Sequence, residues 1–442
     1  MISVRKKRLT GILLICAVFL TSVLVPGGWN VSAAVVQKDF KGQMREAGFP
    51  ESYLSSLETL HKKYPDWKFE AVNTGLKWTD VIKNESVNGV NLVPKSVEDA
   101  KKSTAEGAYD WTTNTWTIFD GSSWVAAHPD YIAYYMDPRN FLNETDIFQF
   151  ESLSFSESQT EEGVKAILAS TFMEKPVKDA DGTTLDYAKA FMEIGKACSV
   201  SPYHLASRVR QEQGTKVGTM ISGTYKGYEG YYNYFNIGAS GVSSAQVIKN
   251  GLSYAKQAGW NTRYKSLAGG AKVIVKNYIS VGQDTLYFQK FNVVYGKKLY
   301  WHQYMGNLTA AYTEGRKVAQ GYTDKNQAFV FRIPVYKEMP AKALSFTKKG
   351  NPNNYLKSLK VAGKTLIPFF SGGKTDYSLE LSDTGSITIS AAPVASGSVV
   401  SITGPKKLRK GINTYTISCK AANGSKRSYQ LKINCKEEKK AA

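Results

Sequence analysis

Residues 201–214 read Ser-Pro-Tyr-His-Leu-Ala-Ser-Arg-Val-Arg-Gln-Glu-Gln-Gly and predict a short helix with defined ends. Ser201 is a good N-cap, because its hydroxyl can accept a hydrogen bond from a free amide of the first turn. Pro202 suits the first helical position, and Gly214 closes the helix. We therefore expect a helix over residues 201–213.

The register of this helix gives one acid an unusual place. Leu205 and Val209 are four residues apart, and Glu212 follows three residues later, on the stripe that the helix should bury. A lone carboxylate on an apolar face is costly unless it is paired or protonated. Burial also raises the pKa of a carboxyl group, as a general acid working near neutral pH requires. Glu212 is thus the candidate proton donor, and an ion pair with Arg208 is the structural alternative.

The segment around this helix, residues 156 to about 320, is predicted to be mainly α-helical. Ser158 and Glu161 form a predicted capping box at the start of one helix. Apolar residues at spacings of four, three and four predict another helix over 187–198, and a further one is expected near 271–278.

An aromatic and amide-rich stretch follows the central helix. Residues 231–236 contain three tyrosines, a phenylalanine and two asparagines. Such a stretch is an improbable core strand, because each polar tip would need a buried partner. It suits the wall of a sugar-binding cleft, where rings stack on sugars and amides bind hydroxyl and acetamido groups.

These residues resemble the bacterial endo-β-N-acetylglucosaminidases that cut peptidoglycan, the glucosaminidase family 73 autolysins. The resemblance spans about residues 160–320 and rests on blocks in family order: 201–206, 212–215, 232–239, 259–260, 269–272, 277–279, 282–287 and 302–305. It implies a lysozyme-like helical fold and hydrolysis of the β-1,4 bond after N-acetylglucosamine in peptidoglycan glycan strands.

The same resemblance implies the site residues. Glu212 takes the place of the general acid that protonates the leaving oxygen. The implied substrate-binding residues are Asn233, Tyr234, Phe235, Tyr287, His302, Gln303 and Tyr304. Two departures stand out: the family often has Phe-Gly-Ile at 235–237, where this chain has Asn236, and some members have an aspartate where residues 240–241 are Ser-Gly.

The second departure leaves the mechanism open. Hydrolysis with two carboxylates needs a partner about 5–5.5 Å away for retention or about 6.5–9.5 Å away for inversion. Glu229 is the candidate second catalytic residue, with an exposed loop acid as its alternative. The acetamido oxygen of the substrate could instead serve as the nucleophile.

The segments before and after the helical centre differ from it in composition and in the spacing of apolar residues. Residues 34–155 hold five of the eight tryptophans, which we interpret as core residues rather than a sugar-binding stripe.

Residues 352–436 alternate apolar and polar positions, predict an antiparallel β-sandwich, and resemble the bacterial cadherin-like repeat. A patch at 348–353 is expected to be a linker. The predicted fold class is α+β multidomain, with a lysozyme-like catalytic domain over 156–340 and a C-terminal sandwich.

The first residues are typical of an export signal. Residues 5–8 are basic, residues 9–25 are almost entirely apolar, and residues 31–33 offer the small residues that signal peptidase requires. We predict a signal peptide over residues 1–33, a secreted, cell-wall-associated protein and no membrane span after cleavage. A retained membrane anchor is the alternative, because the lengths of signal and spanning segments overlap.

Positive charge is concentrated in the tail. The chain has a net charge of +20, and residues 341–442, with 18 basic and 5 acidic residues, carry +13 of it. A nucleic-acid enzyme should carry this charge in its active domain, so we predict no nucleic-acid partner. We expect the C-terminal domain to bind anionic cell-wall polymers; a solvated lysine-rich surface is the alternative.

The few cysteines and histidines, four of each, argue against a disulfide scaffold or a zinc array. A hairpin turn at Asn423-Gly424 would place Cys419 and Cys435 about seven strand residues apart, or about 20 Å. A disulfide needs Cα atoms within about 7 Å, so both are predicted to be small buried apolar residues. We predict no metal and no cofactor, and no calcium site in the acid-poor tail.

Two other functions remain open. A muramidase or lytic transglycosylase of lysozyme-like fold also uses one glutamate but cleaves after N-acetylmuramic acid. A non-catalytic wall-binding protein would account for the two departures and the binding-type tail.

Overall fold

The structure is a computed structural model that describes residues 39–240, 243–322 and 324–436. The predicted signal peptide, residues 1–33, lies outside the described residues. The chain separates into the units Met1–Asp39 and Phe40–Ala442, and the description below concerns the second unit. Within the described ranges, no helix is long and apolar enough to cross a bilayer.

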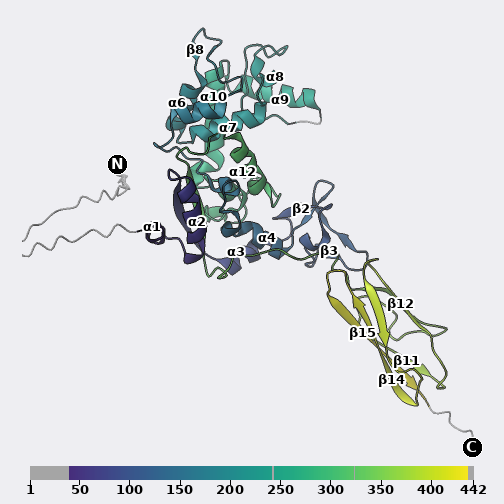
Figure 1. Cartoon of the computed structure of the whole chain (residues 1–442). Helices are drawn as coiled ribbons and strands as arrows, with labels where there is room; N and C mark the ends of the chain where they lie inside the picture. Colours follow the sequence, from purple (N-terminus) through teal and green to yellow (C-terminus); the bar gives the residue numbers. More distant parts are fainter. Residues whose placement is uncertain (1–38, 241–242, 323, 437–442) are drawn as a thin grey trace, which may run out of the picture. The chain divides into compact units, whose positions relative to one another are not determined.

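The centre of the chain is helical, as predicted, and most of its helices are labelled in Figure 1. They are α5 (Glu161–Leu168), α6 (Tyr187–Cys198), α7 (Pro202–Gln213), α8 (Thr219–Ser222), α9 (Ser244–Gln257), α10 (Arg263–Asn277), α11 (Leu286–Lys290) and α12 (Ala310–Gly321). A short hairpin of β7 (Val177–Lys178) and β8 (Thr184–Leu185) interrupts them.

The ends of α7 are those that the sequence predicts. The hydroxyl of Ser201 accepts a hydrogen bond from the backbone amide of His204 at 3.1 Å. Pro202 occupies the first turn, and Gly214, with a φ of 73°, ends the helix by donating to the carbonyl of Arg210. A positive φ is readily adopted by glycine, which explains the residue type at this cap.

The predicted capping box at the start of α5 is wrong. The N-cap is Thr160, whose hydroxyl accepts from the amide of Gly163 at 3.1 Å. Ser158 instead contacts the hydroxyl of Ser156 at 2.8 Å within the preceding turn. The sequence offers several hydroxyl residues here, and the one nearest the first helical residue provides the cap.

The N-terminal segment adds helices and short strands. Its elements are α1 (Phe40–Glu46), α2 (Glu51–Lys63), β1 (Lys68–Lys77), α3 (Trp78–Glu85), β2 (Leu92–Pro94), β3 (Tyr109–Asp110), β4 (Thr115–Trp116), β5 (Ile118–Asp120), β6 (Trp124–Ala126) and α4 (Pro129–Met136). Strands β2, β6 and β5 form one small sheet, and β3 pairs with β4.

This segment shares its core with the helical region. Strand β1 pairs in parallel with β9 (Val330–Lys337), so a strand near the start of the described chain lies beside one that follows α12. One hydrophobic cluster runs from Phe49 to Tyr336. The predicted domain boundary at residue 155 therefore does not separate two hydrophobic cores, because β1 lies before that boundary and its partner β9 lies after it.

Three of the five tryptophans in the segment are buried in the core, as interpreted from the sequence: Trp67, Trp78 and Trp116. The ring of Trp67 lies 4.8 Å from that of Phe331 on β9, and its indole NH donates to the carbonyl of Lys325. These rings thus help to join β1 to β9.

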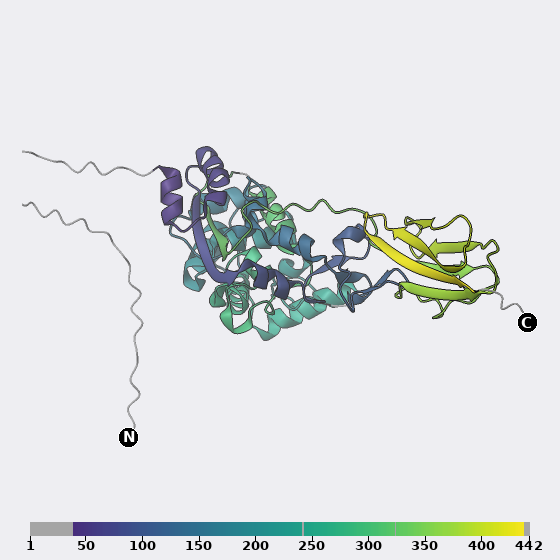
Figure 2. The ribbon, with the colours of Figure 1, turned by 90° about the horizontal axis from the view of Figure 1, so that it is seen from below.

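The C-terminal residues form strands packed around a second core, coloured green to yellow in Figure 2. The strands are β10 (Leu356–Val361), β11 (Asp376–Leu381), β12 (Ile389–Pro393), β13 (Val399–Thr403), β14 (Gly411–Lys420) and β15 (Lys426–Cys435). One sheet has the order β10-β12 and the other β11-β15-β14-β13. The described chain is therefore α+β, as predicted.

The predicted antiparallel arrangement is wrong for one strand pair. Strand β11 runs parallel to β15, with Tyr377 opposite Leu431. Two parallel strands need a long connection between them. Here the connection from β11 to β15 contains β12, β13 and β14. Strand periodicity shows which face is buried but not the direction of a non-local partner.

The two cysteines of the last hairpin are free and buried, as predicted. Cys419 lies opposite Arg427, and Cys435 lies opposite Gly411, so the two cysteines stand far apart along the hairpin. Gly424, with a φ of 88°, lies in the connecting turn.

Candidate functional site

A cleft of about 290 Å³ collects several of the sequence blocks on its walls. Its lining comprises His204, Arg208, Ile237, Val273, Ile274, Asn277, Tyr278, Leu286, Gln289, Tyr304, Met305 and Glu314. These residues come from α7, the aromatic stretch, α10, α11, the loop before α12, and α12 itself. Blocks separated by up to about a hundred residues in the sequence therefore meet at one place.

Glu212, in the last turn of α7, is not among the residues that line this cleft, but it pairs with one of them. Its Oε1 is 2.9 Å from Nη2 of Arg208, a cleft-lining residue one turn earlier. Its side chain is 26 % exposed. The predicted burial on a purely apolar stripe is therefore wrong, and the ion pair with Arg208, the structural alternative, is present. The pair remains beside the cleft rather than away from it.

Asn236 is the second partner of Glu212. Its side-chain NH2 group donates to Oε2 of Glu212 at 3.0 Å, and its side-chain oxygen Oδ1 accepts from Nε2 of Gln213 at 2.8 Å. The backbone of Asn236 has a φ of 52°, a left-handed conformation that asparagine tolerates better than most residues. The departure from glycine thus keeps the backbone shape and adds a side chain that holds the acid.

A second carboxyl group, Glu314 on α12, lines the cleft and was missed from the sequence. Burial raises the pKa of Glu314, Arg208 lowers it by attraction, and the nearby Glu212 raises it by repulsion. The spacing could have indicated this residue, because Glu314 lies four residues from Ala310 and four from Val318, both buried on α12.

Two further cleft residues are buried polar groups. The hydroxyl of Tyr304 is inaccessible to solvent and interacts with the carboxyl group of Glu314. Burial, together with Glu314, raises the pKa of Tyr304. Burial lowers the pKa of His204 to about 3, so its imidazole is neutral at physiological pH. Of the predicted binding residues, Tyr304 is the one that the structure places in the cleft wall.

The aromatic residues predicted to line the cleft lie in the core instead. Tyr234 is 1 % exposed, and its hydroxyl lies 2.6 Å from that of Tyr187 on α6. Phe235 is also buried, close against Gly270 of α10. Their assignment as cleft residues is wrong, because the chain pairs the polar tip of Tyr234 with another buried tyrosine.

Tyr287 and Asn233 are likewise fully buried. The hydroxyl of Tyr287 donates to the carbonyl of Met136 at 2.7 Å, which joins α11 to α4. The amide of Asn233 donates to the carbonyls of Ile237 and Gly251. Both side chains therefore hold backbone segments together, and neither is among the residues that line the cleft.

His302 and Gln303 form hydrogen bonds outside the cleft lining. Nδ1 of His302 lies 2.5 Å from Oε1 of Gln283. Gln303 donates to Glu85 at 2.9 Å and accepts from Nζ of Lys290 at 2.8 Å, within a buried polar cluster. Both residues come directly before Tyr304 in the sequence, but neither of them lines the cleft.

Glu229 is an exposed loop residue, which is the alternative that the sequence left open. Its carboxylate accepts from the backbone amide of Gly227 at 3.0 Å, and backbone hydrogen bonds lower its pKa. It contributes nothing to the cleft lining around Arg208. The structure therefore does not bring Glu229 into contact with Glu212.

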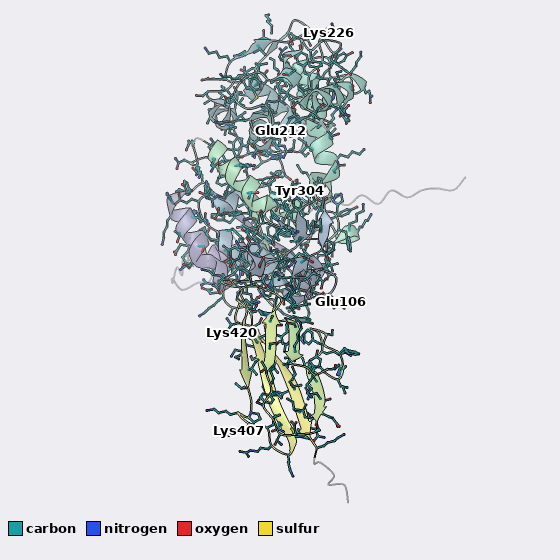
Figure 3. The ribbon with its side chains drawn as sticks, turned by 90° about the vertical axis from the view of Figure 1, so that its right-hand side faces the viewer. Glu106, Glu212, Lys226, Tyr304, Lys407 and Lys420 are labelled. Carbon is teal, nitrogen blue, oxygen red and sulfur yellow. The ribbon has the colours of Figure 1, made fainter. Side chains whose placement is uncertain are left out.

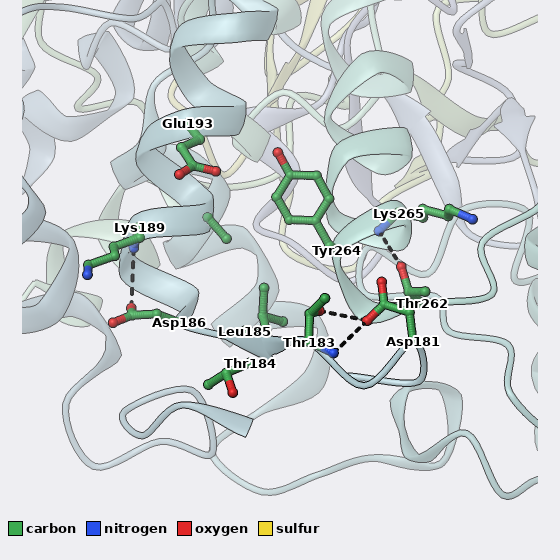
Figure 4. A pocket seen from close by; sticks show the side chains of 11 residues that line it. Asp181, Thr183, Thr184, Leu185, Asp186, Lys189, Glu193, Thr262, Tyr264 and Lys265 are labelled. Carbon is green, nitrogen blue, oxygen red and sulfur yellow. Dashed lines mark hydrogen bonds between the residues drawn. The ribbon is translucent and has the colours of Figure 1, made fainter. Parts of the chain in front are cut away.

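Another hollow, of about 370 Å³, lies beside the β7–β8 hairpin and is shown in Figure 4. Asp181 accepts there from the amide and hydroxyl of Thr183, and Thr262 caps α10 through the amide of Lys265. Its polar groups thus already stabilise local turns. None of its lining residues belongs to the cleft near Glu212.

In the described ranges, no group of three or more His, Cys, Asp or Glu side chains is arranged to hold a metal ion. The polar groups of the cleft are carboxyl, guanidinium, imidazole, phenol and amide groups. Figure 3 labels Glu212 on α7 and Tyr304 in the segment before α12. The arrangement can bind a neutral polar ligand and offer it a proton.

Comparison with known proteins gives one local sequence match. The chain is 39 % identical over 92 residues to proteins named "Bifunctional autolysin" from Staphylococcus aureus, among them those of strains MSSA476 and MW2. The match covers 20 % of this chain and 7 % of each relative. No family model matches the chain.

Two solved structures are also similar. Glucosaminidase B of S. aureus has 23 % identity and a TM-score of 0.44, with 62 % of this chain and 94 % of that chain covered. A structure titled "Major Bifunctional Autolysin" has 21 % identity and a TM-score of 0.41, with 61 % and 98 % covered. The local sequence match is therefore to autolysins, the broader class that the sequence blocks predicted.

Proposed function

We propose that this protein is a secreted peptidoglycan hydrolase that cleaves the β-1,4 bond after N-acetylglucosamine, with Glu212 as the general acid. One observation carries the proposal: Glu212 is held by Arg208 and Asn236, and Arg208 lines a cleft whose walls include residues of the glucosaminidase-like blocks. The local similarity to bifunctional autolysins supports it. The lysozyme-like and cadherin-like assignments of the two domains are part of the same proposal.

The chemistry follows from the position of Glu212. A glycan strand lying in the cleft places a glycosidic oxygen beside the carboxyl group. Glu212 donates its proton to that oxygen as the bond to the anomeric carbon breaks, and water then completes the hydrolysis.

We also propose that the basic C-terminal domain keeps the enzyme on the wall. Exposed lysines stand on several of its strands and turns, including Lys406, Lys407, Lys420, Lys426 and Lys432. An anionic polymer can neutralise such a surface over many weak contacts. The domain would then concentrate the catalytic domain near its substrate without taking part in the chemistry.

The test is the chemistry of the released fragments. Purified wild-type protein, Glu212→Gln and the control Glu193→Gln, an exposed acid of α6, are incubated with cell walls. We expect clearing and new N-acetylglucosamine reducing ends with wild type and the control, and at least a hundredfold slower release with Glu212→Gln. N-acetylmuramic acid or anhydro-muramyl ends would reject the bond assignment, and equal release by all three proteins would reject the role of Glu212.

A further inference from the structure

A buried polar cluster joins the N-terminal segment to a loop that forms part of the cleft wall. This Glu85 cluster consists of Glu85 at the end of α3, Asn91 just before β2, Lys290 at the end of α11, and Gln303. The first three side chains are at most 1 % exposed. The proposed general-acid chemistry uses none of the four, although burying an acid and a base is costly unless both are held by partners.

Hydrogen bonds connect the four side chains in a closed ring. Nζ of Lys290 donates to Oδ1 of Asn91 at 2.6 Å and to Oε1 of Gln303 at 2.8 Å. The side-chain NH2 groups of Asn91 and Gln303 both donate to Oε2 of Glu85, at 2.6 and 2.9 Å. Such a ring holds its members in one arrangement, because a buried polar group that lost its partner would stay desolvated.

Two cleft-lining residues are direct chain neighbours of cluster members. Gln289 precedes Lys290, and Tyr304 follows Gln303. The backbone amide of Tyr304 also donates to the carbonyl of Gln289 at 3.1 Å. A shift of the Gln303 side chain would therefore be passed to the wall by the backbone itself.

Strand β2 of the N-terminal segment holds the same loop at a second point. The amide of Leu92 donates to the carbonyl of Gly306 at 2.8 Å, and the carbonyl of Leu92 accepts from the amide of Leu308 at 2.9 Å. The loop is thus attached by side chains at Gln303 and by backbone at Gly306. Residues 304 and 305, which both line the cleft, lie between the two attachments.

We propose that Glu85 is a positioning residue for glycan binding: through Gln303 it holds residues 304 and 305 where a glycan strand contacts them. This inference rests on the proposed function and gives the N-terminal segment a part in substrate binding. Glu85 is fully buried and does not line the cleft, so it acts only through its partners. A wall that is already ordered loses less conformational entropy when the substrate binds, so loosening it weakens binding.

The ring can be rebuilt with the acid on the other side. Gln303→Glu alone sets a second carboxylate against Glu85, and Glu85→Gln alone leaves Lys290 without an acid in the cluster. The exchange variant Glu85→Gln/Gln303→Glu again pairs an amide with a carboxylate, next to Lys290, at unchanged net charge. Asn91 keeps its 2.9 Å bond to the main-chain carbonyl of residue 85. The bond from Gln303 to the carbonyl of Tyr300 is not restored, so recovery should be incomplete.

The experiment measures kcat and KM on short soluble peptidoglycan glycans with the full-length protein and its variants. We expect KM to rise about tenfold in Gln303→Glu and about threefold in Glu85→Gln, with kcat within about threefold of wild type. Saturating substrate orders the wall, so kcat continues to depend on Glu212. In the exchange variant, KM should return to within about threefold of wild type. Partial unfolding would instead lower kcat and leave KM unchanged, because it removes active enzyme.

Asp137→Asn is the matched control. Asp137 is also a fully buried acid; it pairs with Arg139 at 2.8 Å and does not line the cleft. This variant should be less stable than wild type but should keep the wild-type KM. Urea unfolding of every variant gives its stability and shows that it is folded.

Failure of the proposed function and failure of this inference give different results. If wild type releases no sugar reducing ends, the proposed function fails, and calorimetric glycan affinities, with the same order of variants expected, test the Glu85 cluster directly. If wild type is active, a folded Gln303→Glu with wild-type KM overturns the role of Glu85 alone. An exchange variant no better than Gln303→Glu, or a KM raised equally in Asp137→Asn, would also overturn it. Should Gln303→Glu not fold, a wild-type KM in Glu85→Gln does so.

Discussion

The side-chain amide of Asn236 donates to Oε2 of Glu212 at 3.0 Å from a backbone position with a φ of 52°. The same side chain accepts from Gln213, so Asn236 connects the aromatic stretch to the last two residues of α7. Glycine would satisfy the backbone equally well. The asparagine side chain therefore serves the orientation of Glu212 rather than the shape of the turn.

Asn236→Gly should reduce kcat about ten- to a hundredfold without straining the backbone, because the loss of one hydrogen bond to a charged group removes about 1.5–3 kcal/mol of the interaction that orients Glu212. Asn236→Ala should lower both kcat and the free energy of unfolding, since alanine is strained at a positive φ by about 1 kcal/mol. Hydrolysis rates and urea unfolding of the two variants check this. Wild-type kcat in Asn236→Gly would show that Glu212 needs no such support.

Gly270 of α10 sets the position of the aromatic stretch through close packing. A Cβ atom added there would lie 2.2 Å from Cδ2 of the buried Phe235. Gly270→Ala should therefore lower the free energy of unfolding by about 2 kcal/mol, as overpacking of cores does. Gly321→Ala, in the last turn of α12 with no atom within 4 Å, is the matched control and should be neutral or stabilising by up to about 1 kcal/mol. Equal urea midpoints for both variants would contradict the packing argument.

Local signals predicted the elements better than their partners. The cap residues Ser201 and Gly214 fixed α7, and alternation located the C-terminal strands, because both signals depend on neighbouring residues. The parallel pairings β1–β9 and β11–β15 join segments far apart in the sequence, and no short-range pattern encodes them. For the same reason, the sequence predicts a domain boundary at residue 155, whereas the structure has one core between residues 49 and 336.

The candidate site shows a similar limit. The spacing of α7 led to Glu212 and also to its alternative partner Arg208, one turn away, which the structure contains. Composition alone could not distinguish an aromatic cleft wall from a core whose hydroxyls pair with each other, as Tyr187 and Tyr234 do. Glu314 lies outside the family-like blocks and was missed, although the helical spacing of α12 could have indicated it.

Charge on the C-terminal domain should control retention on the wall. Changing Lys406, Lys407, Lys420, Lys426 and Lys432 together to Gln removes five exposed charges without removing buried side chains. We expect weaker cosedimentation with cell walls at low salt and a smaller loss of binding between 0.05 and 0.5 M salt, because screening acts on charge contacts. Turnover of short soluble glycans should not change. Retention equal to wild type at both salt concentrations would reject the electrostatic role.

Glu151 is a buried carboxyl group that the proposed chemistry does not use. It is 3 % exposed, and its two oxygens accept from the hydroxyl of Tyr322 at 2.7 and 2.9 Å. No basic side chain forms an ion pair with it in the described part of the chain. Burial raises its pKa to about 8. The folded protein therefore favours the protonated, neutral form.

This raised pKa predicts how stability depends on pH. In the unfolded chain Glu151 titrates near its usual value of 4.5, so between pH 5 and 8 the folded state binds the extra proton and stability falls as pH rises. At about 1.4 kcal/mol per pH unit, wild type should lose about 2–3 kcal/mol between pH 5 and 7 through this residue. Glu151→Gln, which is neutral and can still accept from Tyr322, should lack that loss. Urea unfolding at both pH values measures the difference, and parallel pH dependences for the two proteins would show that Glu151 is ionised in the folded state.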